Sequence, residues 1–335
     1  MRDLFTKIAI YLLPSLLLLS ACAYKPGPVS NHLTAEQQGT IWFASNDGYD
    51  FNAYHPDLAL IVEGDLTIPQ PHNGKAVILS HGSGGIRDYH RNWQDFLNRN
   101  GYATFMLDHF RPRNTLNVLH SQVRVTEQQM AFDILHAYQL LQTHPQIKST
   151  DIFHMGWSKG ASAGMLAALS KVEALVYGIA SDVNDNKIAG FIEFYPWCGV
   201  RGKLQISAPV RIFHGDEDDY TLLSACQQFV EDLQTAGGDI EIIVLQGAKH
   251  GFDAWDNPVE HLPRSVTVRE ASQPCTLKID PQTLEITSLD GVHRVDNYET
   301  RKQFLIACAE RGVSVGGSAQ HKDDTEKRVL EVLHG

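Results

Sequence analysis

The feature that most constrains this 335-residue chain is a repeated alternation of short apolar runs with helical patterns. Each run has the length of a buried strand, and an amphipathic or small-residue stretch follows it. This alternation predicts an α/β fold with a mostly parallel central sheet and helices on both faces. The expected strands are 76–80, 103–107, 152–155, 191–195, 210–213 and 240–245, and the expected helices are 93–98, 126–141, 161–169 and 222–235.

The C-terminal part interrupts this rhythm. The stretch T-L-K-I-D-P-Q-T-L-E-I-T-S-L-D-G predicts a small hairpin insertion over 264–292, and helical patterns follow near 298–311 and 324–333. With 43% hydrophobic residues, the chain is ample for one large core and short for three domains. We expect one α/β domain over 53–335, preceded by an N-terminal tether and lead-in over 22–52.

The first 21 residues are a separate segment. A weakly basic start leads into the apolar run 8–19, which ends in L-S-A-C at Cys22. The run is short for a permanent membrane helix and is typical of a secretory signal peptide. The ending resembles the bacterial lipobox, where cleavage before the cysteine leaves it as the lipidated first residue. An ordinary signal peptide with an incidental cysteine is the alternative.

We therefore expect an exported lipoprotein, held in the membrane by a lipid at Cys22. Ala23 resembles the residue that favours the outer membrane in Gram-negative bacteria, which predicts an anchor there with the domain facing the periplasm.

The net charge argues against a nucleic-acid partner. It is −11 for the whole chain, and loss of residues 1–21 removes Arg2 and Lys7 against Asp3, which leaves −12. No cluster of Lys and Arg offsets this acidity. The expected partner is a small molecule, and the sequence does not indicate an oligomeric state.

Four cysteines remain after Cys22, which permits two disulfides in three connectivities. Cys198 ends one expected strand, and Cys226 lies in the helix after the next strand, so both lie near one edge of neighbouring strands. We predict a disulfide between them, which leaves Cys275 to pair with Cys308.

Residues 156–160, G-W-S-K-G, follow an expected strand and precede an expected helix. In this setting a G-x-S-x-G pattern makes a sharp turn that exposes the serine hydroxyl, with helix amides beneath it. Ser158 is therefore the candidate nucleophile, against the alternative of a serine in a surface turn.

A serine nucleophile needs a histidine held by a carboxylate. The stretch V-R-I-F-H-G-D-E-D-D supplies acids just after a strand, and His250 in L-Q-G-A-K-H-G-F-D follows the next strand. Their order after the serine is the order in which α/β hydrolases supply acid and base.

The loop H-G-S-G-G at 81–85 follows the first expected parallel strand. We expect a backbone amide of Ser83 or Gly84 to form an oxyanion hole with the amide of Lys159. A phosphate-binding loop is the alternative, but the spacing and the terminal Lys-Ser/Thr of that motif are missing.

We expect no cofactor and no metal. The sequence has no H-E-x-x-H and no paired C-x-x-C, and the acidic run 216–219 lacks the glycine and distal glutamate of a calcium loop.

Several stretches together resemble the dienelactone hydrolase family of α/β hydrolases over about residues 60–255. They are I-L-S-H-G-S-G-G, W-Q-D-F-L-N-R-N-G-Y-A before L-D-H-F-R-P-R, G-W-S-K-G-A, F-Y-P-W-C-G, H-G-D-E-D-D-Y-T and G-A-K-H-G-F-D. The resemblance implies the α/β-hydrolase fold and a triad of Ser158, Asp218 and His250. The G-x-x-D spacing of the family, counted from Gly215, selects Asp218.

The chain departs from the founding enzymes of that family, which have cysteine in place of Ser158 and a carboxylate near the position of Gly82. It resembles the serine-bearing branch, which implies hydrolysis of a small ester or lactone through an acyl-serine. The substrate-binding arginine of the family corresponds to Arg111 or Arg113, and either arginine could instead be a surface salt-bridge partner. A thioesterase, amidase, peptidase or catalytically silent binding lipoprotein is an alternative on the same fold.

The anchor is tested by changing Cys22→Ala. The wild-type protein is expected in the detergent phase on Triton X-114 partitioning, because a lipidated cysteine binds apolar phases. The variant should lose both this partitioning and its processing. Unchanged partitioning and processing in the variant would contradict the lipoprotein hypothesis.

Overall fold

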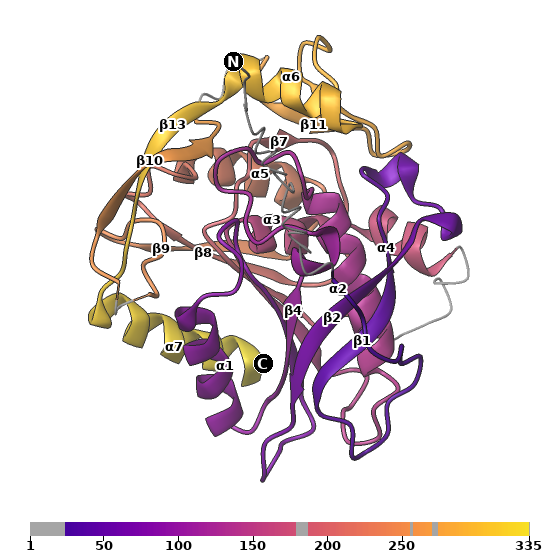
Figure 1. Ribbon diagram of the computed structural model, residues 1–335. Helices are drawn as coiled ribbons and strands as arrows, with labels where there is room; N and C mark the ends of the chain where they lie inside the picture. The colour runs from indigo at the N-terminus through magenta and orange to yellow at the C-terminus, as the bar shows by residue number, and fades with distance from the viewer. Residues whose placement is uncertain (1–23, 179–186, 255–256, 270–273, 335) are drawn as a thin grey trace, which may run out of the picture.

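An eight-stranded sheet runs through the centre of the molecule in the order β1-β2-β4-β3-β5-β6-β8-β9 (Figure 1). Pairings are antiparallel between β1, β2 and β4 and parallel from β4 to β9, which confirms the mostly parallel sheet. The strands are β1 Gly39–Asn46, β2 Ala59–Thr67, β3 Ala76–Ser80, β4 Ala103–Asp108, β5 Ile152–Trp157, β6 Phe191–Phe194, β8 Val210–Gly215 and β9 Ile240–Leu245.

The computed structural model describes residues 24–178, 187–254, 257–269 and 274–334. The expected signal peptide and Cys22 lie outside the described residues. Within those ranges, no helix has the length and apolar character needed to span a bilayer.

Helices cover both faces of the sheet, and most residues of the parallel strands are apolar for that reason. In β3, Val77 and Leu79 pack into a core with Trp93 of α1 and Val329 of α7, whereas Ile78 packs into the core on the other face. The helices are α1 Asp88–Arg99, α2 Glu127–Leu141, α3 Lys159–Ala167, α4 Ser170–Tyr177, α5 Leu223–Thr235, α6 Tyr298–Cys308 and α7 Ala319–His334.

Strands β1 and β2, which are the antiparallel strands of the central sheet, were not predicted. We expected 22–52 to be only a tether and lead-in, but β1 lies inside this range and pairs with β2 along its full length. Its side chains alternate between buried and accessible, so only residues such as Ile41 and Phe43 mark it as a strand. The sheet therefore begins before residue 53.

The C-terminal part is more than a hairpin. Strands β11 Leu277–Ile279 and β12 Ile286–Ser288 form a hairpin inside 264–292, and β11 also pairs with β7 Val200–Arg201. However, β10 Glu260–Thr267 pairs with β13 Glu310–Val315 in a separate sheet. The helix expected to reach residue 311 ends at Cys308, and the β-branched pattern after it continues as β13.

Both predicted disulfides are present. Cys198 after β6 is bonded to Cys226 in α5, with Cα atoms 4.8 Å apart. Cys275 before β11 is bonded to Cys308 at the end of α6, with Cα atoms 5.3 Å apart.

Reduction is expected to lower the free energy of unfolding by about 2–4 kcal/mol per disulfide, because each bridge closes a loop of the unfolded chain. The measurement is denaturant unfolding of the domain from Ala23 with and without reductant. The double variant Cys275→Ser/Cys308→Ser is the control and should lose only one of the two increments. Four titratable thiols in the unfolded, unreduced domain would contradict the pairing.

Candidate active site

Ser158 lies on a sharp turn between β5 and α3. Its backbone has φ 53° and ψ −113°, which is a strained conformation for a residue with a side chain. The flanking glycines are required by close packing. A Cβ on Gly160 would lie 2.1 Å from the carbonyl oxygen of Ser80, and one on Gly156 would lie 2.6 Å from a carboxyl oxygen of Glu193. The turn therefore tolerates no side chain at either position.

A second G-x-S-x-G pattern, at residues 312–316, has a different setting. Most of it forms β13, so it makes no strand-to-helix turn. The same pattern thus occurs twice, and only the copy at Ser158 stands at a turn of this kind.

The hydroxyl of Ser158 lies within hydrogen-bond distance of a histidine that is itself held by an acid. His250 Nε2 is 3.0 Å from Ser158 Oγ, and His250 Nδ1 is 2.8 Å from Asp218 Oδ2. The three residues follow β5, β8 and β9, whose carboxyl ends lie at one edge of the parallel sheet. The structure thus brings together the three residues that the sequence predicts.

The acid is fixed by several hydrogen bonds. Asp218 Oδ1 accepts from the amides of Tyr220 and Thr221 at 2.8 and 2.9 Å, and Oδ2 also accepts from the Thr221 hydroxyl at 3.0 Å. Burial alone would raise the pKa of this carboxyl, but attraction to His250 and the hydrogen bond with it hold the pKa below 3.8. Asp218 is therefore a carboxylate aimed at the imidazole.

The neighbouring aspartates have other partners. Asp216 accepts from the amide of Gly247 at 2.6 Å, and Asp219 accepts from the amide of Ser314 in β13 at 2.7 Å. In turn, the amide of Gly316 donates to the carbonyl oxygen of His250 at 2.8 Å. The unpredicted strand β13 therefore braces both the acid loop and the histidine loop.

The loop at 81–85 passes over the nucleophile. A Cβ on Gly82 would lie 3.2 Å from the Cβ of Ser158, so the loop that carries the amides of Ser83 and Gly84 packs against the nucleophile. Lys159 is the first residue of α3, where helix amides lack intrahelical acceptors. Throughout the described ranges, none of these three amides donates a hydrogen bond to another backbone group. They can serve as oxyanion donors.

Asp253, three residues after His250, anchors the back of the site. It accepts hydrogen bonds from the indoles of Trp93 and Trp157 at 2.8 and 2.7 Å, and from the hydroxyl of Tyr195 at 2.6 Å. The centroid of the Tyr195 ring in turn lies 4.4 Å from the centroid of the His250 ring. One buried carboxyl thus links α1 and the ends of β5 and β6 to the histidine loop. No sequence motif indicated this role of Asp253, because the donors of its hydrogen bonds lie far apart along the chain.

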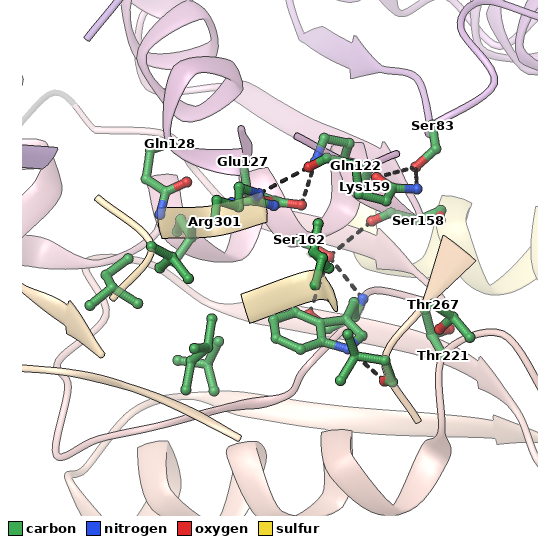
Figure 2. Close-up of a pocket in the computed structure, with 18 of the residues that line it drawn as sticks. Ser83, Gln122, Glu127, Gln128, Ser158, Lys159, Ser162, Thr221, Thr267 and Arg301 are labelled. Carbon is green, nitrogen blue, oxygen red and sulfur yellow. Dashed lines mark hydrogen bonds and ion pairs between the residues drawn. The ribbon is translucent and has the colours of Figure 1, made fainter. Parts of the chain in front are cut away.

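A cavity opens beside Ser158 (Figure 2) and encloses about 970 Å³, including its opening to solvent. Ser83, Ser158, Lys159 and Thr221 line it together with many apolar side chains. Largely apolar linings of this kind are typical of small-molecule sites.

An ion cluster forms part of the cavity wall (Figure 2). Glu127 accepts from Lys159 Nζ at 2.5 Å and from Arg301 Nη2 at 2.6 Å, and Arg301 Nε donates to the Gln122 carbonyl at 2.9 Å. Burial would raise the pKa of Glu127, but Arg301 and Lys159 outweigh it and hold the pKa at about 2. Burial lowers the pKa of Lys159 to about 8 against the attraction of Glu127.

The predicted substrate arginines do not line the cavity. Arg111 is exposed and pairs with Glu63 at 3.0 Å, and Arg113 is buried between Asp47 and Asp133. Both are salt-bridge partners, and Arg111 is one at the surface, as in the alternative interpretation of the sequence, whereas the Arg113 pairs are buried on the arginine side. Among the described lining residues the arginine is Arg301 of helix α6, and 174 residues of chain separate it from its partner Glu127. Sequence motifs close to the nucleophile could not have identified it.

Comparison with known families identifies the chain. The sequence profile of the dienelactone hydrolase family matches residues 62–273. This chain belongs to the dienelactone hydrolase family. It is accordingly a hydrolase of small molecules, and the matched segment contains Ser158, Asp218 and His250.

Solved structures also resemble this family member. A candidate dienelactone hydrolase from Klebsiella pneumoniae has 15% identity and a TM-score of 0.47, and the match covers 64% of this chain and 89% of that chain. Est1E from Butyrivibrio proteoclasticus has 18% identity and a TM-score of 0.41, over 63% and 90%. A thermophilic esterase from Thermogutta terrifontis has 18% identity and a TM-score of 0.44, over 57% and 79%. No curated protein sequence matches the chain.

The ion cluster predicts acid sensitivity in this dienelactone hydrolase family member. Because the pKa of Glu127 falls from 4.5 to about 2 on folding, its contribution to stability is present above pH 4.5 and is lost as the pH falls toward 2. Glu127→Gln should destabilise the protein at pH 7, since Lys159 and Arg301 lose their counter-charge. The difference from wild type should shrink by on the order of 2 kcal/mol at pH 3.

The measurement is urea unfolding at both pH values. Glu217→Gln is the control, because Glu217 is exposed and pairs only with Lys249. A gap between wild type and Glu127→Gln that stays constant with pH would contradict the assignment.

Proposed function

We propose that this protein is a serine hydrolase that cleaves small carboxylic esters or lactones through an acyl-serine intermediate. The observation that carries the proposal is the hydrogen-bonded series Ser158, His250 and Asp218 beside a largely apolar cavity, whose wall includes Ser158. Membership of the dienelactone hydrolase family supports the same chemistry.

In the acylation step, Ser158 Oγ attacks the ester carbonyl carbon while His250 Nε2 takes its proton. Asp218 accepts a hydrogen bond from Nδ1–H of His250, which keeps Nε2 free as the base and stabilises the imidazolium. The carbonyl oxygen becomes an oxyanion, and we assign the amides of Lys159 and of Ser83 or Gly84 as its hydrogen-bond donors. The imidazolium then protonates the leaving alcohol, and an acyl-serine remains.

Deacylation repeats these roles with water. His250 Nε2 takes a proton from the water as its oxygen attacks the acyl carbon, and the same amides hold the second oxyanion. Collapse of this intermediate breaks the bond to Ser158 Oγ, which recovers its proton from the imidazolium. The products are the acid and the regenerated enzyme. With a lactone, alcohol and acid remain in one molecule.

We also propose that the domain works at a membrane surface, anchored through a lipid at Cys22. The support for this is the L-S-A-C ending of the apolar N-terminal run. The cysteines after it all form disulfides, which suits an exported protein.

The triad is tested by substitution. Ser158→Ala or His250→Ala should lower kcat for an aryl ester by ~10⁶, and Asp218→Ala by about 10⁴, because the acid acts through the histidine. Ser158→Ala should also abolish labelling by a fluorophosphonate probe, which reacts with activated serines.

The matched controls are Asp216→Asn and Asp219→Asn. Each removes a neighbouring charge that does not contact His250, so kcat should fall by less than about tenfold. A large loss of kcat in one of these two variants, together with an active Asp218→Ala, would show that a different acid serves the histidine. Normal turnover in Ser158→Ala would overturn the proposed function.

A further inference from the structure

The cavity beside Ser158 extends into an apolar chamber that follows helix α3. Ser158, Ser162, Met165 and Leu166 all line it, and their spacing of four, seven and eight residues places them on one face of the helix. Eight residues of α-helix rise about 12 Å, so the lining extends far beyond the space that an acetyl group would fill.

One wall of the chamber comes from the C-terminal part of the chain. Its six apolar side chains belong to β11, β12, α6 and the segment between β12 and α6, namely Leu277, Ile279, Ile286, Val295, Phe304 and Leu305. All of them lie beyond residue 273, where the family match ends. The reactive groups thus come from the family part of the chain, and this wall comes from a segment outside it.

Three kinds of bond hold this wall in place. The amide of Leu277 donates to the carbonyl of Gly199 at 2.9 Å, at the start of the β11–β7 pairing. The disulfide between Cys275 and Cys308 joins the two ends of the wall segment. Arg301 of α6 is bonded to Glu127. The chamber is therefore preformed, which limits the ordering cost of binding.

In the described part of the chain, the charged side chains of the chamber wall are paired with one another. Among its described lining residues, the charged side chains are Glu127, Lys159 and Arg301, and both cations are bonded to the one carboxylate (Figure 2). Apolar surface that is buried against such a wall favours binding of uncharged groups.

We propose that the substrates are esters with an uncharged apolar group of medium length, and that residues 277–305 select for this group by enclosing it. The inference rests on the proposed function and names its substrate class. The apolar group can belong to the acyl or to the alcohol part of the ester, and the experiment separates the two.

The test compares kcat/KM in two series on the full mature protein. The first lengthens the acyl group, from 4-nitrophenyl acetate through the butanoate to the hexanoate. The second lengthens the alcohol, from ethyl through butyl to hexyl acetate. Each buried methylene should raise kcat/KM by up to about fourfold, so at least one series should rise by about tenfold or more.

Leu305→Trp and Ile306→Trp form a matched pair on α6. Leu305 lines the chamber, whereas Ile306 is 68% exposed on the outside of the same helix. Leu305→Trp should reduce the preference for the long ester over the short one by about tenfold, because the larger ring fills the space of the chain. Ile306→Trp should keep the wild-type preference. Thermal unfolding and fluorophosphonate labelling of both variants show that each is folded with a reactive serine.

Three results would overturn the inference. The first is a flat profile in both series while the acetates are hydrolysed, which leaves the proposed function intact. The second is faster hydrolysis of the 4-nitrophenyl monoester of adipic acid than of the hexanoate, since these differ by a terminal carboxylate. The third is an equal loss of preference in Ile306→Trp and Leu305→Trp. Absence of both ester hydrolysis and probe labelling would instead overturn the proposed function, and this inference with it.

Discussion

The close approach of helix α3 to the sheet is the constraint on which the site depends. Gly156, Gly160 and Gly164 recur every four residues, and a Cβ on any of them would lie within about 2.7 Å of an atom of Ser80 or Glu193. With nothing between helix and sheet, the chain must turn sharply at Ser158, and the strain of that turn is held by the packing on either side. The oxyanion donors and the start of the chamber both follow from this placement of α3.

A buried network next to this contact has the residue types and distances of a catalytic triad but no access to a substrate. Ser80 Oγ is 3.0 Å from His109 Nε2, and His109 Nδ1 is 2.8 Å from Asp133, so the distances match those at Ser158. All three side chains are buried within the protein, and Asp133 is also bonded to Arg113. A second histidine, His154, shares the same serine hydroxyl at 2.9 Å. This network links β3, β5 and the residue that follows β4 to helix α2. Only the group of residues at the cavity can meet a substrate.

The sequence predicted those strands and site residues best whose signals lie within one short stretch of the chain. The six parallel strands and the nucleophile turn are encoded in short stretches, so Ser158 and His250 were found from the residues around them. Asp218 required the spacing known from the family, because three aspartates lie within four residues. Strand β1 and the pairing of β10 with β13 were missed, since half-buried edge strands carry weak patterns and their partners are distant. Glu127, Asp253 and Arg301 were missed for a similar reason, because contacts across the fold give them their roles.

The disulfide between Cys275 and Cys308 makes the covalent closure of the chamber wall dependent on the redox conditions around the protein. Cytosolic thiols are kept reduced, whereas the bacterial periplasm favours disulfides. The residues around Ser158 are positioned by the sheet and its hydrogen bonds, none of which involves this bridge. In a reducing compartment the protein would thus have its reactive groups in place without a covalently closed chamber wall. Oxidising conditions close the wall, so the selectivity proposed for it would depend on the redox conditions around the protein.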